Sequence, residues 1–344
     1  MSAVRWPTAA RVAARLAGTY PLEDTYHFSL LERQAPALVE RAAGLVEEET
    51  GLVGPSEPEV RVVTRRQWAE ANIEVFAKLL EPAERKISER AGGVGKAVAG
   101  RLIAVEMGAL LGLLSKRVLG QYEMVLPTKD GEAGDVVYLV GANLLAIERL
   151  HEFRPAQFRF WVALHECAHR LQFQGVPWMR EYFFGLVSDM MDSATPEPGR
   201  MAKAAAEMRQ AAAAGEPMVT EAGLMGLLAS DDQRANLDRI QALMSLLEGH
   251  GHVIMDRIGA REIPAARRMS QALRARRQDP RTKTFFRLVG LEMKFQQYEL
   301  GERFVLGVEK EAGWRALDRV WESPEMLPNL DEIKEPQRWL TRVS

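Results

Sequence analysis

The sequence predicts a mainly α-helical protein with a small β-hairpin or sheet. Apolar residues recur at helical spacing along most of the 344 residues, whereas runs rich in β-branched and aromatic residues are few and short. Apolar residues make up 47% of the chain, which is enough for a sizeable buried core. We therefore expect helices to form the framework and short strands to make up a minor part of it.

The first third of the chain is predicted to be helical. Apolar residues follow helical spacing, and helices are therefore expected, at residues 9–16, 31–48 and 67–80. Glycines and prolines between residues 51 and 58 indicate a loop, and residues 59–63 are expected to form a short strand. Pro82 is expected to interrupt the third of these helices.

The longest apolar region, residues 97–119, is expected to form a buried helix. Gly108 and Gly112 lie one helical turn apart in it, a spacing that lets another backbone approach closely. Charged residues interrupt the region, and its cleanest part is too short to cross a bilayer. We therefore do not expect a membrane-spanning segment.

The period of the sequence changes after this helix. Residues 123–126 and 136–140 are β-rich, and proline and glycine between them predict a hairpin with a longer loop. From Asn143 onward helical spacing dominates almost to the end. Glycine and proline break it near residues 175–177, 195–199 and 215–217.

Charge and cysteine content narrow the classes of partner. The chain has 45 basic and 47 acidic residues, a net charge of -2, so we expect neither nucleic acid nor a membrane as a partner. One basic cluster is interpreted as a solvated helix face, because no aromatic residues are interleaved with it: Arg267, Arg268, Arg274, Arg276 and Arg277. A single cysteine and a start without the features of an export signal favour a cytoplasmic setting.

The segment His165-Glu166-Cys167-Ala168-His169 carries the chemistry. Pro155 suits the first position of a helix and Gly175 its end, so the segment lies within a predicted helix of about twenty residues. Two histidines four residues apart project from one face and can hold one metal ion. We predict that His165 and His169 are ligands of Zn²⁺ and that Glu166 is the general base for a metal-bound water. Cys167 lies on the opposite stripe and is interpreted as core.

A third ligand must come from elsewhere in the chain. Residues 246–256 are dense in donors, and Glu248, His252 and Asp256 share one helical stripe. Glu248 is the first choice, because a carboxylate completes the two-histidine, one-glutamate set of catalytic zinc sites, and His252 is the second. Asp256 or Asp189 could accept the free N–H of a coordinating histidine. His250 lies outside the stripe and is interpreted as exposed or locally bonded.

Several stretches resemble the zincin-like metallopeptidase family, often labelled as associated with deazaflavin-cofactor biosynthesis. The resemblance covers most of the chain and is carried by residues 158–166, 169–173, 175–180, 247–250 and parts of 297–324. It implies a zincin-type metal site on a largely helical framework. The motif helix would lie at the centre of this framework, and Glu248 would be the third ligand.

The sequence favours a zinc-dependent hydrolase, in the first instance a metallopeptidase acting on a peptide or small-molecule substrate. The alternative is a non-catalytic scaffold or regulatory binding protein whose metal site is closed because Glu248 and His252 both coordinate. We expect residues 1–150 to form an N-terminal helical region with the hairpin, and residues 151–344 a metal-binding helical region. With no long flexible linker between them, the two regions should pack as one unit.

Two further residue sets have a functional and a structural interpretation. In zincins an edge strand beside the motif helix pairs with an extended substrate, and residues 136–140 are the candidate here. The alternative is that this strand only closes a small sheet over the core. Tyr298 could donate a hydrogen bond to a developing oxyanion, and the alternative is core packing with a satisfied hydroxyl.

Overall fold

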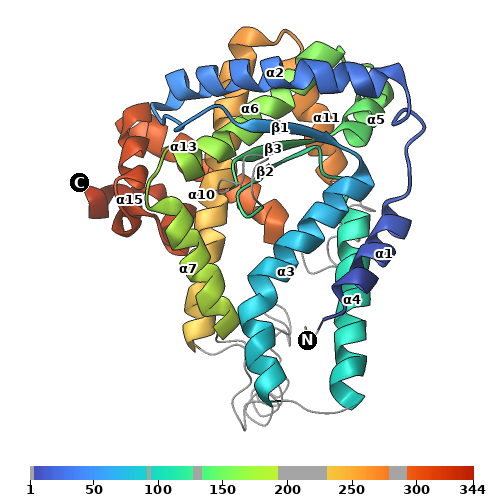
Figure 1. Ribbon diagram of the computed structural model, residues 1–344. Coiled ribbons are helices and arrows are strands. Elements are labelled where there is room, and N and C mark those ends of the chain that lie inside the picture. Colours follow the sequence, from blue (N-terminus) through green and yellow to red (C-terminus); the bar gives the residue numbers. More distant parts are fainter. Residues whose placement is uncertain (1–3, 91–93, 127–133, 193–230, 279–292) are drawn as a thin grey trace, which may run out of the picture.

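The computed structural model describes residues 4–90, 94–126, 134–192, 231–278 and 293–344. In this part of the chain the order is α1 (Trp6–Ala17), α2 (Tyr26–Thr50), β1 (Glu59–Val63), α3 (Arg65–Arg90), α4 (Val94–Leu114), β2 (Gly120–Glu123), β3 (Val136–Val140), α5 (Gly141–His151), α6 (Pro155–Gln174), α7 (Met179–Asp192), α10 (Asp231–Glu262), α11 (Ala266–Gln278), α13 (Met293–Ala312), the 3₁₀ helices η1 (Trp314–Trp321) and η2 (Pro324–Met326), α14 (Leu330–Lys334) and α15 (Pro336–Val343). The predicted fold class, mainly helical with a small sheet, is confirmed (Figure 1). The predicted breaks near residues 195–199 and 215–217 lie outside the described residues.

The three strands form one sheet in the order β1-β3-β2. β1 is parallel to β3 and β2 is antiparallel to it, so the expected strand at residues 59–63 and the expected hairpin are both present. The first hairpin strand lies earlier than predicted, beginning at Gly120. The expectation that residues 136–140 form the edge strand is wrong, because β3 is central and all five of its residues are buried. The edge strand beside the motif helix is β2, because Gly120 lies against Glu166.

The apolar helix α4 is not buried as predicted. Its exposed face carries Leu102, which is 58% exposed, together with Ile103 and Val105. The opposite face packs on α1 through the two glycines. A Cβ atom at Gly108 would lie 2.4 Å from the carbonyl oxygen of Ala9, and one at Gly112 would lie 2.7 Å from that of Ala13. Apolar composition gave no indication of which face would be covered.

Helix α3 is longer than predicted, since it continues through Pro82 to Arg90. A proline removes one hydrogen bond within a helix and does not by itself end it. Figure 1 shows α3 and α4 extending away from the sheet, at the opposite end of the molecule from α2. Within the residues that the structure describes, no helix combines the length and apolar character that a bilayer crossing requires.

The motif helix α6 lies directly beneath α2 in the view of Figure 1 and packs against α2, β2 and α10. Its apolar residues on both stripes are buried, as Phe158 and Leu164 show. Cys167 is also buried, as predicted, and its thiol donates to the carbonyl of Val39. Burial raises the pKa of this thiol, so it stays protonated.

Two buried arginines fasten α6 to its neighbours. Arg159 forms a bidentate ion pair with Glu148 of α5, at 2.7 and 3.0 Å. Arg170 forms a second bidentate pair with Asp135, just before β3, at 2.8 and 2.7 Å. The Arg170 guanidinium also donates to the carbonyl of Ser56, just before β1. The sheet and the motif helix are therefore joined by charge-assisted hydrogen bonds inside the protein.

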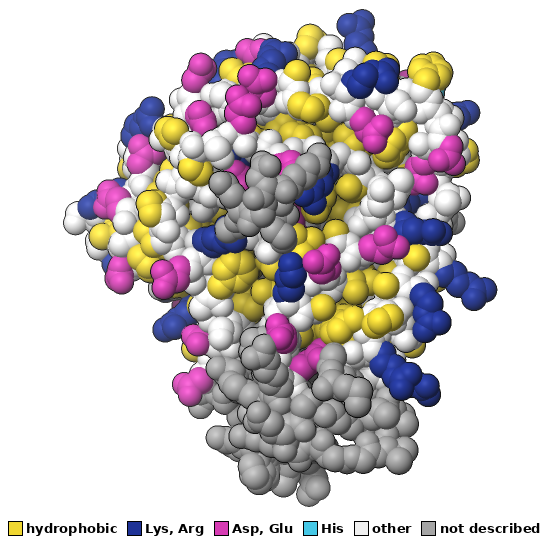
Figure 2. Space-filling view, viewed as in Figure 1, with side chains coloured by type: hydrophobic (Ala, Val, Ile, Leu, Met, Phe, Trp, Pro, Cys, Tyr) yellow, Lys and Arg dark blue, Asp and Glu magenta, His cyan; other side chains and the backbone are white. Residues whose placement is uncertain are grey.

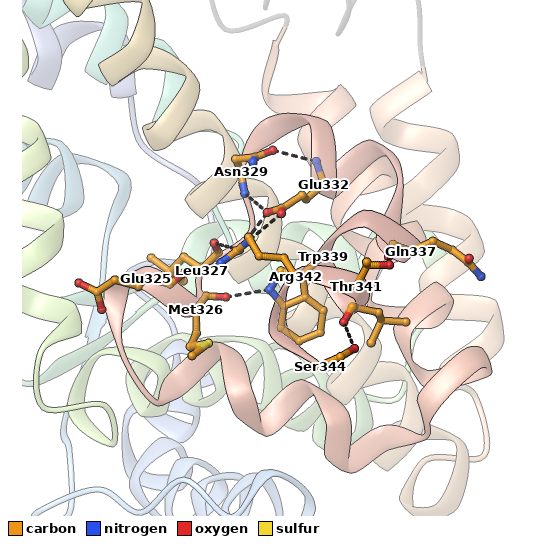
Figure 3. Close-up of polar contacts among 11 residues, drawn as sticks. Glu325, Met326, Leu327, Asn329, Glu332, Gln337, Trp339, Thr341, Arg342 and Ser344 are labelled. Carbon is orange, nitrogen blue, oxygen red and sulfur yellow. Dashed lines mark hydrogen bonds and ion pairs between the residues drawn. The ribbon is translucent and has the colours of Figure 1, made fainter.

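The C-terminal segment folds back on itself through Arg342. Its guanidinium donates to the carboxylate of Glu332, at 2.7 and 3.0 Å, and to the carbonyl oxygens of Glu325 and Leu327 (Figure 3). Trp339 is fully buried and donates to the carbonyl of Met326. This segment belongs to the same apolar cluster as Trp321 of η1.

Lysine, arginine, aspartate and glutamate side chains are intermixed over the face seen in Figure 2. This agrees with a net charge close to zero. The interpretation of the basic cluster at residues 267–277 as a solvated helix face is only partly confirmed. Arg267, Arg268 and Arg274 are exposed, but Arg274 is bonded to Glu302, and the side chains of the other two arginines lie outside the described residues.

Candidate metal centre

Three predicted ligands meet where α10 crosses α6. The Nε2 atoms of His165 and His169 lie 3.1 Å apart. The Oε2 atom of Glu248 lies 3.6 Å from the first of these nitrogens and 3.4 Å from the second. Two adjacent turns of one helix and a residue about eighty positions later thus direct three donor atoms at one point, all within 4.8 Å of one another.

The spacing of the donor atoms fits a zinc ion. Ligand atoms about 2.0–2.1 Å from a tetrahedral zinc would lie about 3.3 Å from one another, which is close to the observed spacing. Two imidazole nitrogens and one carboxylate oxygen are also a donor set that zinc accepts in catalytic sites. The three residues therefore suit the metal that the motif predicted.

The electrostatics of the centre favour a positive charge. Burial alone would lower the pKa of His169, but the hydrogen bond and charge of Glu248, helped by Glu166, raise it to about 9. The negative charges of Glu248 and Glu166 that favour a proton on His169 would also attract a metal cation. Zinc would take the place of that proton.

Glycines set the position of α10. A Cβ atom at Gly249 would lie 2.1 Å from the carbonyl carbon of Gly301 in α13, so these two helices touch backbone to backbone. Gly251 faces α6 instead. A Cβ atom there would lie 3.4 Å from His169 and 3.7 Å from Nδ1 of His165, which is ordinary van der Waals contact. Only the first of these glycines is required by close approach.

The predicted general base, Glu166, is buried and lies over the first residue of the edge strand. A Cβ atom at Gly120 would lie 2.6 Å from Oε1 of Glu166 and 2.8 Å from its Cδ. The glycine therefore leaves the space that the carboxylate group occupies. Sequence reasoning did not identify Gly120, because nothing in the local pattern links it to a helix more than forty residues later.

The other candidate donors lie elsewhere. His252 is buried, but its Nε2 lies 3.1 Å from Arg274, 3.7 Å from Asp256 and 3.9 Å from Glu302. It is not part of the group formed by the two motif histidines and Glu248. Tyr298 lies in α13, and its side chain is outside the described residues.

The partner of His169 is neither of the aspartates considered from the sequence. Asp189 is exposed on α7, and Asp256 lies in the His252 cluster. Instead Nδ1 of His169 lies 3.0 Å from Oε1 of Gln172. The signal was present in the sequence, since Gln172 is three residues after His169 on the same stripe. By contrast, Nδ1 of His165 is buried, and no hydrogen bond from a described residue reaches it.

His250 is buried rather than exposed, and it is bonded to Gln172 at 3.0 Å. Its ring stacks on Trp314, with ring centres 5.8 Å apart and planes 4° apart, and meets Trp321 edge-on at 5.0 Å. Burial lowers the pKa of His250 to about 3, so its ring is neutral at ordinary pH.

Comparison with known proteins identifies a family and a similar solved structure. A family model described as zincin-like metallopeptidase matches residues 4–340. A crystal structure from Chloroflexus aurantiacus, described as a "putative hydrolase with a novel fold", is similar over 99% of this chain and 98% of its own, with 31% identity and a TM-score of 0.72. No curated protein matches the chain at a comparable level. Because the family model spans nearly the whole sequence, the chain belongs to the zincin-like metallopeptidase family.

Proposed function

We propose that the protein is a zinc-dependent hydrolase, and specifically a metallopeptidase. His165, His169 and Glu248 would hold the ion, and Glu166 would act as general base. The observation that carries the proposal is the convergence of three donor atoms at 3.1, 3.4 and 3.6 Å from one another. When bound at such a site, zinc supplies a Lewis acid that polarises a carbonyl group and makes water more acidic.

The chain's own residues would carry the proton. Glu166 follows the first ligand directly in the sequence, and its carboxylate would accept a proton from the attacking water at one oxygen. It would then return this proton to the leaving group. Because the carboxylate is buried over Gly120, it would be held in one place and shielded from bulk water.

The edge strand supports a peptide as the substrate class. β2 pairs with β3 on one side and lies against Glu166 at its first residue. An extended peptide could add to the other side of β2 through main-chain hydrogen bonds, which would bring a peptide bond close to the general base. We extend the proposal to a cytoplasmic setting, on the evidence of a single cysteine that is buried and reduced.

A non-catalytic scaffold with a closed metal site is the competing function, and it requires a fourth protein ligand. The candidate from the sequence was His252, whose Nε2 lies against Arg274. A cationic guanidinium beside that nitrogen disfavours its use as a ligand. Among the described residues three donors meet at this point, which supports a site with one position open for solvent or substrate.

The test is Glu166→Gln, compared with wild type by elemental analysis and by digestion of a peptide library. We expect one zinc per chain in both proteins and a loss of hydrolysis of about 10²–10⁴-fold in the variant, because the base is removed while the ligands remain. Glu311→Gln, at an exposed position of α13, is the matched control and should hydrolyse like wild type. Unchanged hydrolysis in Glu166→Gln, or a wild-type protein that binds no zinc, would overturn the proposal.

A further inference from the structure

We propose that Gln172 and His250 are positioning residues that fix the tautomer and orientation of His169 toward the metal. The inference rests on the proposed function, since it concerns one of the same three ligands. It assigns a role to two buried polar side chains that the motif itself does not include.

A continuous line of hydrogen bonds carries the argument. Nδ1 of His169 lies 3.0 Å from Oε1 of Gln172. The amide nitrogen of Gln172 lies 3.0 Å from the carbonyl oxygen of Leu247 and 3.0 Å from Nδ1 of His250. Gln172 is 0% exposed, so water does not compete for these bonds.

The carbonyl of Leu247 determines the direction of every bond in this line. A backbone carbonyl can only accept a hydrogen bond, so the group that faces it must be the NH₂ end of the Gln172 amide. The oxygen end therefore faces His169, and this oxygen can also only accept. Nδ1 of His169 must then carry a hydrogen. In a neutral imidazole this leaves the lone pair on Nε2, the nitrogen that faces Glu248.

His250 supplies the second acceptor that the buried NH₂ group needs. Its Nδ1 accepts a hydrogen bond from the second N–H of the Gln172 amide, so both N–H groups of that amide have an acceptor. A buried donor without a partner costs about 1–3 kcal/mol, and the amide would then be less firmly held in its orientation. Because the NH₂ group faces Nδ1 of His250, this nitrogen is the acceptor of the hydrogen bond.

The surroundings of His250 hold it in place. Its ring lies between Trp314 and Trp321, both from η1. The indole of Trp314 donates to the carbonyl of Glu49 in α2, and the carbonyl of Trp321 accepts from Trp178. The position of His250 is thus fixed by segments distant in the sequence, which explains how a side chain beyond the ligands can act on them.

The line also joins the two ligand-bearing helices behind the metal site. Gln172 belongs to α6, and its two acceptors belong to α10, on either side of Glu248 in the sequence. A change in the crossing of α6 and α10 would therefore disturb the hydrogen bonds of the amide. Outer partners of this kind are known to tune metal sites through the ligands that they orient.

The experiment measures zinc affinity by competition with a chelator, so it does not depend on finding a substrate. We expect Gln172→Met, which keeps the length but removes the amide, to weaken zinc binding about 10–100-fold. Gln174→Met is the matched control on the same helix, because the hydrogen bond of Gln174 leads away from the ligands to Tyr122. This control should bind zinc like wild type.

Two variants of His250 separate positioning from packing. His250→Phe keeps a ring between the tryptophans but removes the acceptor, whereas His250→Asn loses the ring but returns an acceptor oxygen near the place of Nδ1. We expect the Phe variant to bind zinc more weakly than the Asn variant. Thermal unfolding of the metal-free proteins is measured alongside, and there the Phe variant should be the more stable of the two. The reverse order of zinc affinity would show that His250 only fills space.

The outcomes distinguish this inference from the proposed function. If wild type binds zinc and Gln172→Met binds it equally well, the inference fails and the hydrolase proposal stands. If the affinities follow the expected order but no hydrolysis depends on Glu166, the hydrolase proposal fails and the inference stands. A wild-type protein without zinc affinity would overturn both.

Discussion

Two pairs of helices in this molecule touch through glycine, and they differ in what lies beside the contact. α4 meets α1 at Gly108 and Gly112, where the nearest atom to each added Cβ is the carbonyl oxygen of an alanine. α10 meets α13 at Gly249 and Gly301, and Gly249 directly follows Glu248 in the sequence. Both contacts exclude a Cβ atom, but only the second adjoins a predicted metal ligand.

The difference shows that one packing device can have two purposes. At the first contact close approach buries the small face of α4 and leaves the opposite face in solvent. At the second it fixes the depth of α10 against α13, and thereby the point to which Glu248 reaches. Substitutions at the two contacts should therefore have similar effects on stability and different effects on zinc.

The largest effect is expected from Gly249→Ala and its counterpart Gly108→Ala. The added Cβ would lie 2.1 Å from Gly301 in one case and 2.4 Å from Ala9 in the other, in both cases against backbone. We expect each variant to lose about 3 kcal/mol or more of unfolding free energy, because backbone cannot move aside as a side chain does. Urea unfolding measures this loss.

Zinc affinity of the same two variants completes the comparison. Gly249→Ala should bind zinc more weakly than wild type under conditions where it is folded, because Glu248 is displaced. Gly108→Ala should keep the affinity of wild type. Equal losses of affinity in the two variants would contradict the proposed difference between the contacts.

A change of pH is expected to have the next largest effect. It should change zinc binding but not the contact between α1 and α4, because glycine and alanine do not titrate. The pKa of His169 in the metal-free protein is about 9, so zinc must displace a proton below that pH. Apparent zinc affinity should therefore fall about tenfold per pH unit from about 9 toward neutrality. Calorimetry in buffers of different ionisation enthalpy measures the released proton. A zinc affinity that does not change between pH 7 and 9 would contradict competition between zinc and a proton on His169.

The stability of the metal-free protein should depend on pH in the opposite direction to zinc affinity. A pKa raised in the folded state means that the folded protein holds the proton more firmly than the unfolded chain, whose histidine titrates near 6.5. The contribution of His169 to stability is therefore fully present below that value and is lost as pH rises toward about 9. Thermal unfolding of the metal-free His169→Gln variant should lack this component.

A smaller effect is expected from Gly120→Ala. The new methyl group would occupy the place of the Glu166 carboxylate, which must move aside by about an ångström. We expect hydrolysis to fall about tenfold to a hundredfold while zinc affinity is unchanged, because the base is misplaced and the ligands are not. Gly185→Ala in α7 is the control, since nothing lies within 4 Å of its added Cβ. Loss of zinc in Gly120→Ala would show a wider disturbance of the site.

The smallest effect is expected from Leu102→Gln on the exposed face of α4. The side chain is 58% exposed, so the unfolding free energy should change by no more than about 0.5 kcal/mol and zinc affinity should not change. Denaturant unfolding and chelator competition measure the two quantities. A large loss of stability would mean that this face is covered in solution.

Local spacing predicted those parts of the protein that depend on neighbouring residues. The ends of α6, the shared face of His165 and His169, and the strands at residues 59–63 and 136–140 all follow from patterns of a few residues. Glu248 could also be selected from its surroundings, because a carboxylate suited the motif chemically. The fold class followed from the balance of helical and β-rich runs.

Two errors are local, namely the start of β2 and the continuation of α3 through Pro82, and the others concern relations between distant segments. The prediction of β3 as an edge strand is wrong because strand order depends on which segment pairs with β3 from the other side, and β1 precedes it by some seventy residues. The exposure of α4 depends on which helices pack against it. Gln172 and Gly120 acquire their roles only where α6 crosses α10 and where β2 reaches Glu166.

The buried arginines of α6 have a consequence for the metal-free state. Arg159 and Arg170, near the two ends of the helix, each hold a carboxylate on a different neighbour. For α6 to roll about its own axis, both guanidinium groups would have to leave their partners inside the protein, at a cost of about 3–5 kcal/mol for each. The two ion pairs therefore fix the rotation of α6 about its own axis. We expect the imidazoles to stay aimed at the same point when the ion departs, so that the vacant centre keeps the shape it needs to be refilled.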